Sequence, residues 1–174
     1  MVESGRIFFT FTPPTEKIAL AEFIGEYHCK IDGKGRIMLP SKLRAQIPEN
    51  SGLNMVVNRS FEKCLALFTK GDWTKETEKL KDLNEFHPKA RKFIRQFRAG
   101  ATLIQVDGAS RINLPKNLIE YAELTGDIVL SCSGGKVEIW SKANYDQEFD
   151  FDAEQFAESA EELFGGWRNS DTKE

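Results

Sequence analysis

Apolar and polar positions alternate with a period of two along residues 23–31, which predicts a half-buried strand. Polar turn residues follow it, and Pro40 ends the next apolar run because proline cannot donate to a strand ladder. Ser41 is a candidate N-cap for a short helix over 42–47, and Pro48 stops that helix. The first half of the chain thus predicts a strand, a turn, a strand, a helix and two further strands, at 23–31, 32–35, 36–39, 42–47, about 53–58 and about 64–68.

The same order of elements recurs in the second half, and one motif shows this most clearly. Asp32 to Pro40 reads DGKGRIMLP, and Asp107 to Pro115, 75 positions on, reads DGASRINLP. Six of the nine positions are identical, and the apolar runs on either side also match at nearly the same offset. We therefore infer an internal duplication, in which each copy is a strand, a charged turn, a strand, a short helix and two more strands.

A stretch of different character, residues 71–98, joins the two copies. Asp72 is a candidate cap for an amphipathic helix, and Pro88 begins a second helix with Phe93 and Phe97 on its apolar face. The other face of the second helix is basic and holds Lys89, Arg91, Lys92, Arg95 and Arg98. This basic face is either a solvated surface or subunit contact, which we favour, or a secondary contact to phosphate groups.

Charge is distributed unevenly along the chain. Residues 146–174 contain ten acidic and two basic residues, so this tail carries a net charge of −8. Because the whole chain carries −3, residues 1–145 carry +5, which admits nucleic acid as a partner. Within the tail, residues 153–164 predict a helix. The division that we expect is an N-terminal extension, a first repeat, a helical linker, a second repeat and an acidic tail, at 1–22, 23–70, 71–98, 99–145 and 146–174.

The repeated turn has a chemistry of its own. In the first copy Gly33 and Gly35 tolerate positive φ, and Asp32 can accept hydrogen bonds from backbone N–H groups of the turn. A carboxylate four residues before Arg36 can also hold the arginine side chain in one rotamer. We favour capping of the turn as the main role of the aspartate in both copies, with holding of the arginine as the alternative. A single copy would be interpreted as a β-hairpin with incidental charges, and the second copy is what argues for a function.

The D-x-x-x-R turn, followed by a strand that ends in proline and by a short helix, resembles the AbrB-type swapped-hairpin barrel. Two tandem copies joined by a helical linker, the first reading EYHCKIDGKGRI from Glu26 to Ile37, resemble the MraZ family over about residues 23–145. The resemblance implies a mainly β fold with α-helices, in which two AbrB-like repeats interlock as one pseudo-symmetric β-barrel domain. The second copy departs from the family pattern at Ala109 and Ser110, where a polar or basic residue and a glycine are usual.

The resemblance also implies a function. Proteins of this kind form ring homo-oligomers and regulate transcription, generally as repressors, by binding short direct repeats of double-stranded DNA in the promoter of the bacterial division and cell-wall gene cluster. A cytoplasmic, nucleoid-associated location follows. Carried over to this chain, the DNA-contacting residues are Lys34 and Arg36 in the first turn and Arg111 in the second. The residues that give the motif its structure are Asp32, Gly33, Gly35, Asp107 and Gly108. We expect the second turn to contribute less to binding, because it lacks the lysine and the second glycine.

Two other classes of function are weaker predictions. An antitoxin-like protein would use the acidic, aromatic-rich tail to wrap a partner protein, although antitoxins of this fold carry one copy in a shorter chain. An enzyme is disfavoured because the chain has no G-x-S-x-G, P-loop or H-E-x-x-H motif, and because His28 and His87 lie on different elements. We expect no catalytic residue, metal, cofactor, small-molecule substrate, secretory signal or membrane span. Cys29, Cys64 and Cys132 lack metal-site spacing, and we expect them to be buried free thiols.

Overall fold

The computed structural model describes residues 20–49 and 52–165, so what we expected of residues 1–19 and 166–174 lies outside the described part. Both copies fold into the predicted series of strand, turn, strand, helix, strand and strand. The first copy consists of β1 (Glu26–Lys30), β2 (Arg36–Met38), α1 (Ser41–Arg44), β3 (Asn54–Arg59) and β4 (Leu65–Thr69). The second consists of β5 (Thr102–Gln105), β6 (Arg111–Asn113), α4 (Lys116–Tyr121), β7 (Asp127–Ser133) and β8 (Lys136–Ser141).

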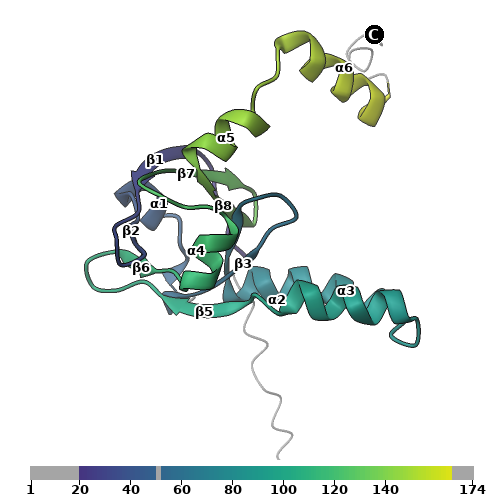
Figure 1. The fold of residues 1–174 in the computed structure, drawn as a ribbon, viewed down its shortest axis with the longest axis horizontal. Helices are drawn as coiled ribbons and strands as arrows, with labels where there is room; N and C mark the ends of the chain where they lie inside the picture. Colours follow the sequence, from purple (N-terminus) through teal and green to yellow (C-terminus); the bar gives the residue numbers. More distant parts are fainter. Residues whose placement is uncertain (1–19, 50–51, 166–174) are drawn as a thin grey trace, which may run out of the picture.

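Further helices follow the last strand of each copy. After β4 come α2 (Lys70–Glu78), the 3-10 helix η2 (Lys79–Asp82) and α3 (Pro88–Arg98), and after β8 come α5 (Lys142–Glu148) and α6 (Ala153–Phe164). Pro88 opens α3 as predicted, because its fixed φ suits the first turn of a helix, where its missing N–H is not needed. The helix predicted at 153–164 is α6. Figure 1 shows α3 and α6 extending away from the strands at two separate places.

Strands of the two copies are exchanged. Six of them form a sheet in the order β1-β7-β8-β4-β3-β5, and β2 pairs with β6 in a separate two-stranded ribbon. β1 of the first copy pairs with β7 of the second, and β5 of the second pairs with β3 of the first, in both cases antiparallel. Because the exchange is the same in both directions, a pseudo-two-fold axis relates the copies. The predicted fold of two interlocked repeats in one mainly β domain is confirmed.

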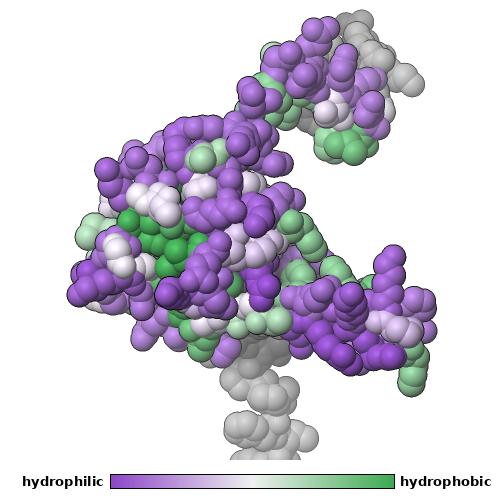
Figure 2. Space-filling view, viewed as in Figure 1, coloured by the Kyte–Doolittle hydropathy of each residue, from purple (hydrophilic) through white to green (hydrophobic). Residues whose placement is uncertain are grey.

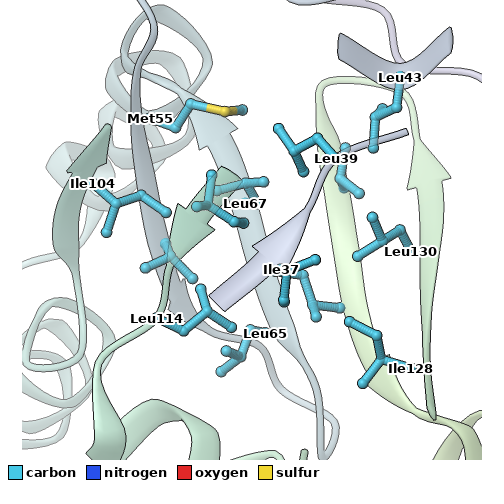
Figure 3. Packing of buried hydrophobic residues seen from close by; sticks show 14 of the residues in the cluster. Ile37, Leu39, Leu43, Met55, Leu65, Leu67, Ile104, Leu114, Ile128 and Leu130 are labelled. Atoms are coloured by element: carbon cyan, nitrogen blue, oxygen red, sulfur yellow. The ribbon is translucent and has the colours of Figure 1, made fainter. Parts of the chain in front are cut away.

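The β2–β6 ribbon contributes the centre of the hydrophobic core. Ile37 lies directly opposite Ile112 in the ladder, and both side chains are buried. Figure 3 shows Ile37 among leucine and isoleucine side chains that come from the sheet and from the strand ends. Burial of one such side chain stabilises the fold by about 1.5–3 kcal/mol, so the two isoleucines fix which face of the ribbon points inward. Side chains next to them in each strand therefore point outward.

The predicted cap of α1 is wrong. Ser41 is the first residue of this helix, the N-cap is Pro40, and no side chain makes a cap hydrogen bond. The helix also ends at Arg44, earlier than the predicted range of 42–47. Pro40 therefore lies between the end of β2 and the start of α1, since its fixed φ is compatible with both extended and helical backbone.

The predicted cap of α2 is wrong as well. Thr69 is the cap, and its hydroxyl oxygen accepts a hydrogen bond from the N–H of Asp72 at 3.1 Å. Asp72 instead lies buried in the first turn of the helix, where its carboxylate accepts hydrogen bonds from the Thr69 hydroxyl and from the N–H of Ala21 at 3.0 Å. The polar pattern placed the start of the helix within a few residues, but it assigned the cap to Asp72 instead of Thr69.

Candidate nucleic-acid interface

Hydrogen bonds to Asp32 organise the first turn. One carboxylate oxygen, Oδ1, accepts hydrogen bonds from the backbone N–H groups of Lys34 at 2.9 Å and of Arg36 at 3.0 Å. The other oxygen, Oδ2, pairs with Nε of Arg36 at 2.7 Å. The two roles considered for this aspartate are therefore both present in the geometry, since one oxygen caps the turn and the other holds the arginine side chain.

The second turn repeats this arrangement around Asp107. Oδ1 accepts hydrogen bonds from the N–H groups of Ala109 and Arg111, each at 2.9 Å, and Oδ2 pairs with Nε of Arg111 at 2.9 Å. The arginine side chains of both turns are 40% exposed. Within the described residues, neither arginine uses its outer nitrogens Nη1 and Nη2 in a hydrogen bond. Each guanidinium can thus offer these two nitrogens to a ligand while its own ion pair stays in place.

The register of the ribbon puts both arginines on the same surface. Arg36 lies directly opposite Asn113 in the β2–β6 ladder. Arg111 lies directly opposite Met38. Directly opposed residues point to the same side of a sheet, and here that side is the outer one, because the inner side holds the two buried isoleucines. We call these four outward-facing residues, Arg36, Met38, Arg111 and Asn113, the ribbon face.

Met38 and Asn113 were not among the predicted site residues. Both are exposed, Met38 to 63%. The sequence contained the signal that would have identified them, because each stands two residues after a motif arginine and a strand repeats its facing every two residues. An asparagine at this place can form two hydrogen bonds to an adenine edge, and a methionine can make apolar contact.

Position 35 is the one at which the first turn requires glycine. Gly35 has φ +79°, and a Cβ atom there would lie 2.7 Å from Cδ1 of Ile119 and 3.1 Å from the carbonyl oxygen of Leu114. Ser110 occupies the equivalent position of the second turn with φ +58°, a conformation that costs an L-residue about 1–2 kcal/mol. The second turn therefore keeps the same backbone shape without the residue best suited to it.

The other motif glycines, Gly33 and Gly108, differ from our expectation for the turn. Neither has a positive φ, and a Cβ atom at either position would meet nothing within 4 Å. Lys34, the predicted lysine contact, is exposed at the tip of the first turn, whereas Ala109 holds the equivalent place in the second. The two turns thus share a frame but present different side chains at their tips.

The hydrogen bonds lower the pKa of both aspartates. The pKa of Asp32 falls from 3.8 to about 2, chiefly because of the backbone N–H of Arg36, with the Arg36 side chain and the N–H of Lys34 adding to the effect against an opposing contribution from burial. The pKa of Asp107 is lowered too, chiefly by the backbone N–H of Arg111. Both carboxylates are therefore ionised at neutral pH, where their ion pairs with the arginines persist.

The remaining sequence candidates lie away from the ribbon. The basic side chains of α3 are exposed, and His28 pairs with Glu26 at 3.0 Å. Between residues 20 and 165, the masked residues 50 and 51 apart, no group of three His, Cys, Asp or Glu side chains could hold a metal ion. Over the same residues, no helix combines the length and the apolar character that crossing a membrane requires.

The prediction of three buried thiols holds for one cysteine only. All three cysteines are free, but only Cys64 is buried, and burial raises its pKa to about 12. Cys29 and Cys132 are half-buried, and burial raises the pKa of each.

Comparison with known proteins decides the family. The family model described as "MraZ protein, putative antitoxin-like" matches residues 23–96 and again residues 97–166. The chain belongs to the MraZ family. Three MraZ relatives, each named "Transcriptional regulator MraZ", show how much of the chain is shared. The relative from Flavobacterium psychrophilum is 39% identical over 143 residues, which cover 82% of this chain and 91% of the relative.

The two other MraZ relatives match over similar lengths. The one from Christiangramia forsetii is 37% identical over 147 residues, covering 84% of this chain and 95% of the relative. The one from Cytophaga hutchinsonii is 37% identical over 139 residues, covering 80% and 92%. The two matches of the MraZ family model divide the chain between the copies that β1–β4 and β5–β8 form, so the sequence duplication, the family model and the fold agree.

Proposed function

We propose that this chain is a sequence-specific DNA-binding transcriptional regulator, a repressor that grips double-stranded DNA through the ribbon face. The observation that supports this most strongly is the placement of Arg36 and Arg111 on one exposed surface, each held by its own aspartate through Nε alone. The printed names of the three relatives point to the same class of function. A regulator of this kind acts in the cytoplasm, on the nucleoid.

The shape of the ribbon suits the major groove of DNA. That groove admits a two-stranded β-ribbon, and an arginine can donate two hydrogen bonds to O6 and N7 of guanine. The aspartate reduces the entropy lost on binding, because the arginine side chain is already ordered before DNA arrives. Lys34 adds a point charge for phosphate at the tip of the first turn.

Multiple copies supply the affinity that one ribbon lacks. One ribbon carries three predicted contacts, Lys34, Arg36 and Arg111, which neutralise few phosphates. A ring of copies that engages short direct repeats gains affinity from effective concentration, since the first contact holds the others near their sites. We place these repeats in the promoter of the bacterial division and cell-wall gene cluster.

Fluorescence anisotropy with duplex DNA from upstream of the chain's own gene tests this proposal. We expect Arg36→Ala to abolish specific binding, while Lys81→Ala, which removes an exposed cation outside the ribbon, leaves binding unchanged. The wild-type affinity should fall steeply with salt, with log K decreasing by about 0.9 per log unit of salt for each phosphate neutralised. Normal binding by Arg36→Ala, or a flat salt titration, would remove the ribbon from the DNA interface.

A second candidate function has one observation in its favour. Apolar side chains of α6, among them Phe156 and Leu163, are exposed in an otherwise acidic helix, as in a segment that wraps a partner protein. The description of the family as antitoxin-like points the same way. Co-purification of one small protein that is lost on removal of α6, together with no affinity for the duplex, would favour this candidate over the DNA-binding regulator.

A further inference from the structure

The ribbon face contains two identical residues and two different ones. The pseudo-two-fold axis exchanges Arg36 with Arg111 and Met38 with Asn113, because the members of each pair stand 75 positions apart on the matching strands β2 and β6. The arginines obey this symmetry, whereas an apolar side chain and an amide occupy the other two places. The ribbon face therefore has two chemically different ends, Arg36 with Asn113 and Arg111 with Met38.

The end that contains Asn113 offers a complete amide to a ligand. Asn113 is exposed, and within the part of the chain that the structure describes its side chain makes no hydrogen bond. It lies directly opposite Arg36, so the two Cβ atoms are about 5 Å apart, close enough for contacts to adjacent base pairs at a rise of about 3.4 Å. An arginine pairs with O6 and N7 of guanine, and an asparagine pairs with N6 and N7 of adenine. This end is therefore complementary to a guanine next to an adenine.

The end that contains Met38 offers apolar surface instead. Met38 lies directly opposite Arg111 and lines a shallow hollow together with Pro40, Ala109 and Ser110. Figure 2 shows green, hydrophobic surface beside the β2–β6 ribbon, with purple, hydrophilic side chains around it. A thioether has no hydrogen to donate, and thymine is the base that presents a methyl group in the major groove. This end is therefore complementary to a guanine next to a thymine.

The length of the ribbon face lets both ends reach bases at once. Arg36 and Met38 stand two residues apart on β2, and Arg111 and Asn113 stand two residues apart on β6. Two residues of an antiparallel strand span about 6.8 Å, which equals about two base-pair steps of 3.4 Å. The four side chains therefore cover a few consecutive base pairs of one major groove.

We propose that Asn113 and Met38 determine the base sequence that the ribbon face reads. Asn113 selects adenine beside the guanine of Arg36, and Met38 selects thymine beside the guanine of Arg111. This inference deepens the proposed function and rests on it, since it assigns sequence specificity to two residues outside the D-x-x-x-R turns. Because the two ends of the ribbon face differ, it also distinguishes the two orientations in which the ribbon could lie on its site.

Selection from a pool of DNA duplexes with a randomised central segment tests the proposal. We expect Met38→Asn to replace thymine by adenine at one position of the sequence that the wild type prefers. Asn113→Met should replace adenine by thymine at a different position, and the remaining positions should stay as in the wild type. The matched control is Asn84→Ala, which removes an exposed asparagine in the loop before α3, on the opposite side of the molecule from the ribbon (Figure 1). This control should leave every preference unchanged.

Modified bases in the selected duplex test the same contacts atom by atom, with fluorescence anisotropy as the measurement. Replacing the adenine by 7-deazaadenine removes N7, and it should weaken binding by the wild type about fivefold and by Asn113→Ala not at all. Replacing the thymine by uracil removes the methyl group, and it should weaken binding by the wild type about fourfold and by Met38→Ala not at all. Circular dichroism verifies that the variants are folded, as expected for substitutions at exposed strand positions.

Two outcomes would overturn this assignment of base specificity. One is that Met38→Asn and Asn113→Met prefer the same sequence as the wild type, while Arg36→Ala has lost specific binding. The ribbon would then contact DNA as proposed, and Met38 and Asn113 would be exposed residues without a role in specificity. The other is that the wild type binds no duplex from the pool, in which case the proposed function fails and this inference fails with it.

Discussion

The first and second turns have the same hydrogen-bond frame and different tips. In both, one aspartate oxygen caps the turn and the other holds the arginine. The tips differ at Lys34 and Gly35 in the first turn, where the second has Ala109 and Ser110. The frame is present even with a serine at positive φ, so the second turn has the same shape as the first and one positive charge fewer at its tip. The backbone shape of this motif and the charge at its tip can therefore differ independently between the two turns.

The largest expected difference between the turns is in DNA binding. We expect Arg36→Ala to abolish specific binding and Arg111→Ala to weaken it less, because the first turn also carries Lys34. Each well-placed arginine discriminates bases by about 1–3 kcal/mol, or about 5- to 150-fold per contact. Anisotropy titrations of both variants on the same duplex measure the difference. Equal losses of affinity would mean that the two turns contribute alike, contrary to the expected advantage of the first turn.

A second test exchanges the residues at positive φ. Gly35→Ser should destabilise the fold, because it adds the left-handed cost of about 1–2 kcal/mol and a clash with Ile119 worth about 1–3 kcal/mol. Ser110→Gly should stabilise it by about 0.5–1 kcal/mol, since the relief of strain is partly offset by the greater freedom of glycine in the unfolded chain. Denaturant unfolding measures both free energies. If both substitutions changed the free energy of unfolding with the same sign, the backbone conformations of the two turns would not be equivalent.

A third test exchanges the charge at the tips. Lys34→Ala should reduce the salt dependence of DNA binding, and Ala109→Lys should increase it, by about 0.9 in the slope of log K for each phosphate gained or lost. The measurement is the affinity at four or more salt concentrations. An unchanged slope for Ala109→Lys would indicate that the second tip does not reach phosphate.

The smallest expected effect is on acid stability. Because the pKa of folded Asp32 is about 2 and that of an unfolded aspartate is about 3.9, the unfolded state binds protons first as the pH falls. The contribution of Asp32 to stability is therefore complete above about pH 4 and is lost as the pH falls toward 2. Asp32→Asn should make the free energy of unfolding less dependent on pH in this window and no different in its dependence between pH 5 and 8. A carboxyl titration by NMR with a midpoint near 4 would contradict the hydrogen-bonded turn.

The sequence predicted where the strands lie better than it predicted which strands pair with one another. The repeat motif and the period-two pattern identified every strand of both copies, because apolar alternation is a local property. The same pattern indicates which side of a strand is buried but not which strand lies beside it, so the pairing of β2 with β6 came only with the structure. The ribbon face was half predicted for this reason, with Arg36 and Arg111 assigned and Met38 and Asn113 missed.

The wrong helix caps have a related cause. Ser41 and Asp72 are good cap residues by type, yet a cap also requires non-helical backbone angles at that position. Here Pro40 and Thr69 have those angles, because the chain is still extended at the residue before each helix.

The decisive measurement is a structure of the chain bound to duplex DNA from upstream of its own gene, because it shows which surface contacts the DNA. We expect the β2–β6 ribbon to face the major groove, with Nη1 and Nη2 of Arg36 and Arg111 within 3.2 Å of base nitrogens or of base or phosphate oxygens. Both Nε atoms should still pair with Asp32 and Asp107. A complex in which the DNA lies along the basic face of α3, with the ribbon face in solvent, would contradict it.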